Sequence, residues 1–198
     1  MPRAGLSADA VVELAVSLVD ERSDGLDSLT LAAIAARAGV AVPSLYKHVA
    51  SLDEVRRRVT LIAVRELTRR AGDAATSAAP SDRFRAVAHA IRRFSHEHPG
   101  LAAAAQASGD RQGDALDAEI AAAGRDAIAV VVESLSSYGV PPEHLVDVVR
   151  AARATVMGFV VLEASGGFGL PDDVDASFSA LLDVFEAGVA AQYSPKPA

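Results

Sequence analysis

The residues between positions 42 and 48 include several side chains that can bond to a nucleic acid. A hydroxyl, a phenol, a cation and an imidazole occur there, and each can hydrogen-bond a phosphate oxygen or a base edge. Two apolar residues at the start of the run could touch a thymine methyl group. The candidate DNA-binding residues in this run are Val42, Pro43, Ser44, Tyr46, Lys47 and His48. The same residues would also suit the polar outer face of an ordinary pair of helices, and that alternative stays open at this point.

Two short helices joined by a tight turn are expected to position these residues, between Thr30 and His48. The hydroxyl of Thr30 can cap the first helix, and apolar residues then recur at helical spacing. Gly39 stands where the chain must turn, because glycine adopts a left-handed backbone without steric cost. We expect Val40 to be buried in the turn and Leu45 to be the inward residue of the second helix. This arrangement is typical of a helix-turn-helix.

The distribution of charge favours a DNA-binding surface, although the whole chain is acidic. The 198 residues carry a formal net charge of −7. Between Thr30 and Arg70, however, 8 basic residues stand against 3 acidic ones, so this segment has a net charge of +5 (8 − 3). The basic residues are Arg37, Lys47, Arg56, Arg57, Arg58, Arg65, Arg69 and Arg70. The run Arg56–Arg58 follows the predicted helix-turn-helix, and it either contacts phosphates or forms a solvated helix face.

Other patterns argue against catalysis and against a metal site. His89 and His96 share a predicted helix face with Arg85, Arg92 and Arg93, and these cations disfavour a bound metal ion. The glycine-rich run 166–169 follows a predicted helix rather than a strand, and no G-x-S-x-G nucleophile motif occurs. We therefore expect a protein that is not an enzyme and uses no cofactor or metal.

The composition is typical of a soluble cytoplasmic protein. Cysteine is absent, which excludes disulfides and cysteine-ligated metal sites. The apolar stretches are short and interrupted by charge, so we expect neither a signal peptide nor a membrane span.

Helical periodicity continues along the chain, and no stretch alternates convincingly with a period of two. We therefore predict an all-α fold class, with a helix-turn-helix DNA-binding domain followed by a larger helical domain. Besides the two short helices, we expect helices over residues 7–21, 51–67, 81–97, 99–107, 115–138, 142–164 and 173–192. Small residues are frequent in Ala71–Pro80, so we place a boundary there. The DNA-binding domain would then cover residues 1–70 and the larger domain residues 80–198.

Local signals predict how two of these helices begin. Ser51 and Glu54 match a capping box, in which each side chain accepts a hydrogen bond from a backbone N–H of the other residue. The apolar line of that helix is expected to include Ile62. Ser81 is expected to cap the helix that follows the boundary.

The run Gly25–Val55 resembles the N-terminal domain of the TetR family of transcriptional regulators. The arrangement L-T-L…I-A…A-G-V…P-S-L-Y-K-H-V carries the resemblance. One departure is Leu52, because the family usually has a lysine there, just after the serine that opens the fourth helix. The C-terminal half is similar to a TetR subgroup with a Trp-His-Gly motif, but only Gly158 matches, since Val156 and Met157 replace the first two residues.

The last two predicted helices are candidates for a dimer interface. Small residues there would let a partner helix approach closely, and apolar residues lie beside them. The resemblance implies that these helices pair with their copies in the four-helix bundle of a homodimer, while packing within one chain is the alternative. The candidate interface residues are Ala151, Thr155, Gly158, Phe178, Leu181, Leu182 and Phe185.

The resemblance also implies a ligand cavity among the central helices. The candidate lining residues are Phe94, His98, Leu101, Leu135, Tyr138, Met157, Phe159 and Phe168, although each would equally well fill a core. An apolar cavity favours an apolar effector.

We accordingly expect a homodimeric repressor of a palindromic double-stranded DNA operator, released by an unknown small-molecule effector. Arg3 and Thr30 join the DNA-binding candidates. The alternative is an effector-independent DNA-binding or architectural protein whose C-terminal half only dimerises.

Overall fold

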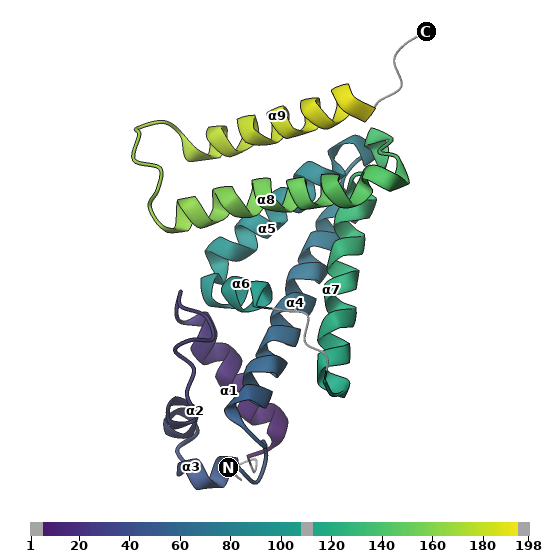
Figure 1. Ribbon diagram of the computed structural model, residues 1–198. Coiled ribbons are helices and arrows are strands. Elements are labelled where there is room, and N and C mark those ends of the chain that lie inside the picture. The colour runs from purple at the N-terminus through teal and green to yellow at the C-terminus, as the bar shows by residue number, and fades with distance from the viewer. Residues whose placement is uncertain (1–5, 108–112, 194–198) are drawn as a thin grey trace. The chain divides into compact units, whose positions relative to one another are not determined.

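Helices make up every regular element in the residues that the computed structural model describes, 6–107 and 113–193 (Figure 1). The predicted all-α fold class is therefore confirmed. The α-helices are α1 (Ala8–Asp20), α2 (Leu31–Ala38), α3 (Val42–Leu45), α4 (Leu52–Ser77), α5 (Arg83–Glu97), α6 (Pro99–Gln106), α7 (Ala115–Ser134), α8 (Leu145–Ala164) and α9 (Val174–Tyr193). Short 3-10 turns occur at η1 (Pro80–Asp82), η2 (Ser136–Tyr138) and η3 (Pro142–His144). None of the helices in the described ranges is long and apolar enough to cross a membrane.

The chain forms two compact units, and each unit combines two separate segments. The first unit comprises Met1–Thr68 with Glu97–Asp126, and the second comprises Arg69–His96 with Ala127–Ala198. This division differs from the expected one, because residues 97–126 pack with the N-terminal helices. In α6, a Cβ on Gly100 would lie 1.8 Å from the carbonyl oxygen of Val19, so the two backbones are in close contact. At the start of α7, Asp114 bonds to Arg57 of α4 at 2.8 Å.

The boundary expected over Ala71–Pro80 does not interrupt the helix before Ser77, because α4 continues to that residue. Alanine is the strongest helix former, so an alanine-rich run extends a helix as readily as it ends one. The hydroxyls of Thr76 and Ser77 donate to the carbonyl oxygens of Gly72 and Asp73, at 2.8 and 2.9 Å. These bonds satisfy the hydroxyl groups within the helix, so the presence of threonine and serine in this run does not mark a loop.

Side-chain caps start the helices of the first unit where the local sequence predicts them. The Oγ of Ser7 accepts from the backbone N–H of Ala10 at 3.1 Å, and the Oγ of Ser51 accepts from that of Glu54 at 3.0 Å. Glu54 reaches one residue further back than the capping box predicts, since its Oε2 accepts from the N–H of Ala50 at 2.7 Å.

The expected apolar line of α4 is wrong at Ile62, which is 39% exposed. Leu61 and Val64 are buried instead, at 6% and 4%. The buried residues of this stretch also include Val59 and Ala63, so they do not fall on a single stripe. A helix that is covered on more than one side loses the simple period on which the prediction rested.

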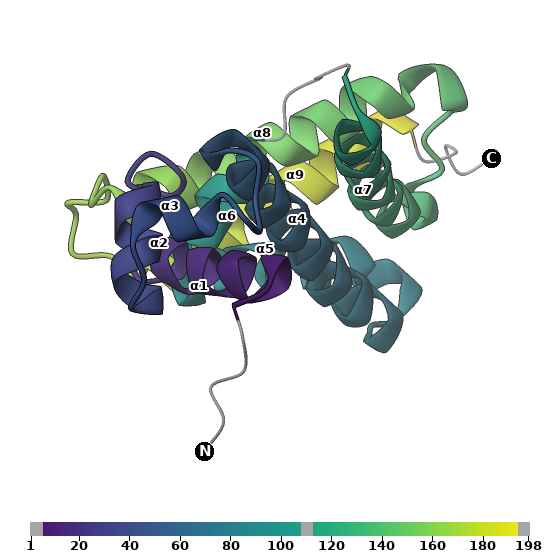
Figure 2. The ribbon, with the colours of Figure 1, turned by 90° about the horizontal axis from the view of Figure 1, so that it is seen from below.

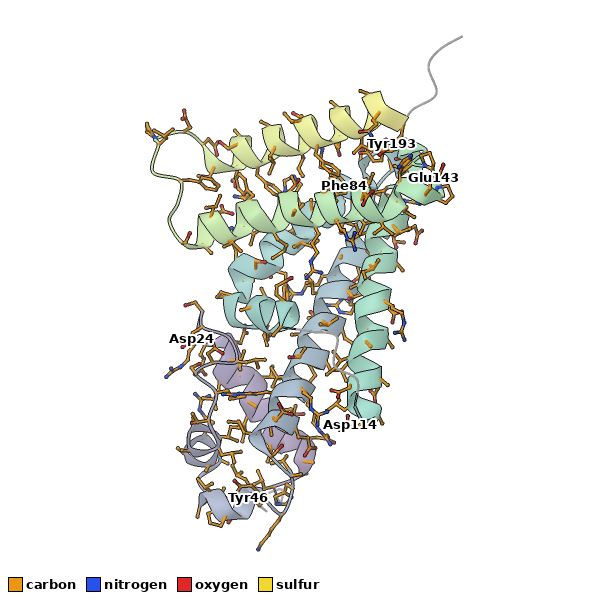
Figure 3. The ribbon with its side chains drawn as sticks, viewed as in Figure 1. Asp24, Tyr46, Phe84, Asp114, Glu143 and Tyr193 are labelled. Atoms are coloured by element: carbon orange, nitrogen blue, oxygen red, sulfur yellow. The ribbon has the colours of Figure 1, made fainter. Side chains whose placement is uncertain are left out.

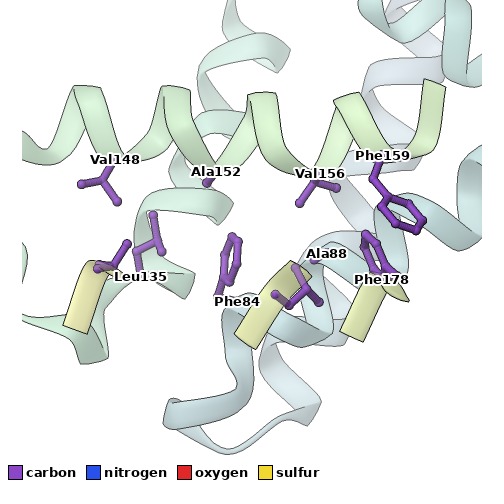
Figure 4. Close-up of a cluster of buried hydrophobic side chains, with 10 residues drawn as sticks. Phe84, Ala88, Leu135, Val148, Ala152, Val156, Phe159 and Phe178 are labelled. Carbon is purple, nitrogen blue, oxygen red and sulfur yellow. The ribbon is translucent and has the colours of Figure 1, made fainter. Parts of the chain in front are cut away.

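The second unit is built around one cluster of buried apolar side chains from α5, α8, α9 and the end of α7. In Figure 4, Val148, Ala152, Val156 and Phe159 of α8 face Phe84 and Leu135, with Phe178 of α9 completing the cluster. The helices α8 and α9 contact each other and lie side by side in both ribbon views (Figure 1, Figure 2).

The chain immediately before α5 differs from the expectation that a serine caps this helix. Ser81 does not cap α5, because it lies inside the 3-10 turn η1 and its hydroxyl donates to Asp82 at 3.1 Å. Pro80 starts this turn, where its missing N–H leaves no bond unmade.

Candidate nucleic-acid interface

A helix-turn-helix forms where the sequence predicts it. The Oγ1 of Thr30 accepts from the N–H of Ala33 at 3.1 Å and begins α2. Gly39 ends α2 with φ +68°, which a side chain would strain, and the N–H of Val40 returns to the carbonyl of Ala35 at 3.0 Å. Leu45 of α3 is fully buried, as expected.

Two details of the turn differ from the expectation. Val40 is only half-buried, so it does not fill the turn. Val49 is 3% exposed and anchors the segment after α3, a role that the sequence pattern did not identify. Val49 lies four residues after Leu45, and its N–H donates to the carbonyl oxygen of Leu45 at 3.0 Å, so helical spacing continued past α3 would have indicated it.

The candidate residues of α3 and of the turn after it are exposed to solvent to different degrees. Pro43 and Lys47 are exposed, and the side chain of Tyr46 is 57% exposed, which is high for a residue of its size. Val42, Ser44 and His48 are half-buried. Figure 3 shows Tyr46 at the end of the first unit opposite to Asp24.

The side chain of Lys47 has no hydrogen bond or ion pair within the described residues. Thr30 is exposed, and its oxygen accepts the cap bond described above. Arg3 lies outside the described residues.

The arginines near this surface bond to groups of the protein itself. Arg37 donates to both carboxylate oxygens of Glu21, at 2.9 and 2.6 Å. These bonds lower the pKa of Glu21 and raise that of Arg37. Arg58 pairs with Glu54 at 2.8 Å, and Arg56 donates to the carbonyl oxygen of Leu29 at 3.0 Å.

Arg57 is held more firmly than the others. It lies 3.1 Å from Asp53, 2.8 Å from Asp114 and 3.0 Å from Asp117, and its side chain is 15% exposed. The hydrogen bonds to Asp114 and Asp117 raise the pKa of Arg57, and the bond from Arg57 lowers the pKa of Asp114. In this structure all three arginines of the run Arg56–Arg58 make intramolecular contacts, and the phosphate contact considered from the sequence stays a prediction.

Two of the candidate dimer-interface residues need correction. Phe178 and Leu182 are fully buried in the cluster of the second unit, so neither can lie on a surface open to a partner. Leu181 and Phe185 are half-buried against the same cluster. The remaining candidates are more open: Ala151 and Gly158 are exposed, and Thr155 is half-buried.

The candidate ligand-lining residues divide between the two units. His98 and Leu101 belong to the first unit, where His98 Nδ1 lies 2.8 and 3.0 Å from the carboxylate oxygens of Asp20. Phe94, Leu135, Tyr138, Met157, Phe159 and Phe168 belong to the second unit. Of these, Phe94, Leu135 and Phe159 are buried, and the rings of Phe159 and Phe168 lie tilted by 42° with centroids 4.6 Å apart.

Tyr138 lies at the edge of the same cluster. Burial is the main cause that raises its pKa, and the neighbouring carboxylate of Glu186 adds to the effect. The phenol is therefore neutral over the whole physiological range.

An ion-pair network in the second unit was not foreseen from the sequence. Arg92 of α5 donates to both oxygens of Glu163 at 2.8 and 2.6 Å, and also to Asp175 at 2.7 Å. Its guanidinium lies over the rings of Phe159 and Phe178, at 5.7 and 4.9 Å from their centroids. Its partners are 71 and 83 residues away in the chain, so no local pattern could have indicated the network.

Comparison with protein families matches both halves of the chain. Residues 14–58 match the bacterial regulatory proteins of the tetR family, and residues 84–185 match a tetracyclin repressor-like C-terminal domain. An uncharacterised HTH-type transcriptional regulator of Mycobacterium tuberculosis is 35% identical over 175 residues, which cover 87% of this chain and 75% of that protein.

Solved structures share the fold. A protein of unknown function from Rhodococcus has a TM-score of 0.75 and 25% identity, covering 96% of this chain and 99% of that one. A TetR protein from Acinetobacter baumannii, in complex with minocycline, has a TM-score of 0.64 and 22% identity, covering 96% of this chain and 100% of that one.

Proposed function

The chain belongs to the TetR family of transcriptional regulators, and we propose that it is a repressor that binds a palindromic operator as a homodimer and is released by a small apolar effector. The observation that carries the proposal is the surface around α3. Pro43, Tyr46 and Lys47 are exposed there, directly beside the fully buried Leu45, so the helix is anchored on one side and open on the other.

The candidate side chains in and after α3 suit different parts of a DNA groove. Val42 and Pro43 begin α3 and offer apolar contact to a thymine methyl group, as residues at the start of a recognition helix do. Ser44, Tyr46 and His48 are hydrogen-bonding groups suited to phosphates, which position the protein on the duplex. We assign Lys47 to a base edge, because it is exposed and its side chain makes no hydrogen bond or ion pair within the described residues.

Footprinting on DNA that flanks the gene of this protein, followed by titration with Lys47→Ala, tests the DNA-binding part of the proposal. As a base contact, Lys47 should contribute about 1–3 kcal/mol to operator binding and to preference at one symmetric pair of positions. Equal affinity of wild type and Lys47→Ala for operator and for scrambled DNA would show that α3 is not the recognition helix.

The outer faces of α8 and α9 support homodimerisation. Val161, Leu162 and Val184 are 60%, 51% and 73% exposed, although large apolar side chains are usually buried. Ala151 and Gly158 are exposed on α8 as well, and small residues allow close approach of another helix. In a two-fold dimer the two recognition helices would lie one duplex turn apart, roughly 34–36 Å, which matches a palindromic operator.

The second unit supplies the residues for an effector. Tyr138, Met157, Phe159 and Phe168 are candidate contacts there, and the minocycline complex of the A. baumannii protein shows that this fold can hold a small molecule. An effector acts only if it binds the DNA-free conformation more tightly than the DNA-bound one. Phe159→Ala should therefore lose induction and keep operator affinity.

The competing proposal is a DNA-binding protein without an effector. Thermal unfolding in the presence of a panel of apolar compounds separates the two. A rise in melting temperature that Phe159→Ala abolishes supports effector control, and no rise with any compound favours the competing proposal.

A further inference from the structure

Three of the five positive charges in and around α3 are paired with carboxylates of the protein, and a fourth, Arg56, is held by a backbone carbonyl. Within the described part of the segment 30–58, the basic residues are Arg37, Lys47, Arg56, Arg57 and Arg58. Each of the four arginines bonds to a carboxylate or a carbonyl of the same unit. Lys47 alone among these five has a side chain without such a bond.

These arginines cannot easily be transferred to a phosphate. Rotation of Arg57 toward DNA would abandon three carboxylates, of which Asp117 is 10% exposed and would remain charged and poorly solvated. Rotation of Arg56 would leave the carbonyl of Leu29 without its bond, and Leu29 is only 2% exposed. The Nε atoms of Arg56 and Arg58 are also shielded from solvent.

The two more exposed arginines, Arg37 and Arg58, would approach DNA together with the carboxylates that pair with them. Arg37 is paired with Glu21, and Arg58 with Glu54. A pair of opposite charges placed near a phosphate has no net charge, so it replaces no counterion of the duplex.

The start of α4 does not compensate for the missing cations. Leu52 occupies the position where the family usually has lysine, and Asp53 and Glu54 follow it in the first turn. The N–H of Glu54 bonds to Ser51, and Glu54 itself accepts from Ala50. The first turn therefore adds no positive charge, and its donors are partly used by its own side chains.

From these observations we infer that operator binding by this protein releases few counterions and depends mainly on neutral and apolar contacts. The inference rests on the proposed function and specifies how its DNA is recognised. The slope of log K against log[salt] is about −0.9 for each phosphate neutralised on double-stranded DNA. Lys47 is assigned to a base edge, but its positive charge also displaces counterions in the groove; counted as at most one neutralised phosphate per protomer, it gives a dimer a slope no steeper than about −1.8. Arg3, if it also binds, brings the slope to about −3.6.

A conventional basic surface would behave differently. If all five basic residues of both protomers neutralised phosphates, the slope would be about −9. Non-specific affinity comes almost entirely from this electrostatic contribution. This protein should therefore bind non-operator DNA weakly, and its discrimination between operator and other DNA should persist at high salt.

The test is a salt titration of operator affinity, from about 50 to about 300 mM KCl, with three forms of the full-length protein. Wild type should give a slope of −4 or shallower, and Lys47→Gln should reduce the magnitude of the slope by at most about 1.8. Arg58→Gln is the matched control, because it removes one positive charge from the same chain segment, one that is paired with Glu54, and should leave the slope unchanged. Circular dichroism melting of each variant establishes that it is folded.

The outcomes separate this inference from the proposed function. A wild-type slope steeper than −4 overturns the inference, as does a slope that Arg58→Gln reduces as much as Lys47→Gln. Absence of binding to any DNA at every salt concentration refutes the proposed function instead.

Discussion

Gly100→Ala is expected to force α6 away from α1. The added Cβ would lie 1.8 Å from the carbonyl oxygen of Val19 and 2.3 Å from that of Arg22. Real Cβ contacts are essentially never shorter than 3.0 Å, so the two helices must separate by at least 1.2 Å (3.0 − 1.8) at this point. Both atoms that obstruct the Cβ belong to the backbone, so no side-chain rotation relieves the clash.

The cost can be compared with known effects of overpacking. Extra methyl groups in a packed interior cost about 1–3 kcal/mol. Alanine recovers up to about 1 kcal/mol of this, because it is a better helix former than glycine. The net loss of stability should be about 1–2 kcal/mol, which lowers the melting temperature by about 2–8 °C for a chain of this length. The buried residues Leu101, Ala104 and Ala105 of α6 should become more accessible.

Gly124→Ala provides a matched control within the same unit. Gly124 lies inside α7, and a Cβ there meets nothing within 4 Å. The same substitution should therefore stabilise the protein by up to about 1 kcal/mol. Urea unfolding of both variants at equal protein concentration measures the difference. If Gly100→Ala were as stable as Gly124→Ala, the close contact between α1 and α6 would not exist in solution.

Three further predictions concern the second unit. Arg92→Met should lower the free energy of unfolding, measured in urea, by about 3–5 kcal/mol, because Glu163 is 13% exposed and would lose its main partner. Adding Glu163→Leu should recover most of this stability. No recovery would contradict the ion-pair explanation. The hydrogen bond from Arg92 lowers the pKa of Glu163 from its ordinary value of 4.5, so this carboxylate stabilises the fold above that pH and the contribution is lost as the pH falls below it. A plot of the stability of Glu163→Gln against pH should therefore fall less steeply on the acid side. An unchanged acid side would assign acid unfolding to other groups. Gly158→Leu should weaken the dimer, because Gly158 is exposed on α8 and a large side chain would hold paired helices apart. If sedimentation at low micromolar concentration shows an unchanged dimer, the interface lies elsewhere.

Local sequence determined many helix ends and the helix-turn-helix of this protein. Ser7, Thr30 and Ser51 act as caps through bonds to residues three positions ahead, and Gly39 ends α2 in a left-handed conformation. These interactions span only a few residues, so propensity and periodicity are sufficient to predict them. The inward position of Leu45 follows from the same spacing.

Composition was less informative where a segment could adopt more than one structure. The small residues of Ala71–Pro80 suggested a break, but α4 continues to Ser77. Ile62 was expected inside and is exposed. The helix propensity of the alanines explains the extension of α4, and packing on more than one side of this 26-residue helix explains the exposure of Ile62; neither follows from one apolar stripe.

The tertiary structure alone decided which charges and apolar residues remain available for partners. The sequence shows a net charge of +5 between residues 30 and 70, yet Arg57 is bonded to Asp114 and Asp117, 57 and 60 residues further along the chain. Phe178 and Leu182 have the spacing of an interface, yet they fill the core of their own unit. The physical reason is that a charge or an apolar side chain has the same local signal whether it meets solvent, DNA or its own chain, and only the fold brings distant partners within bonding distance.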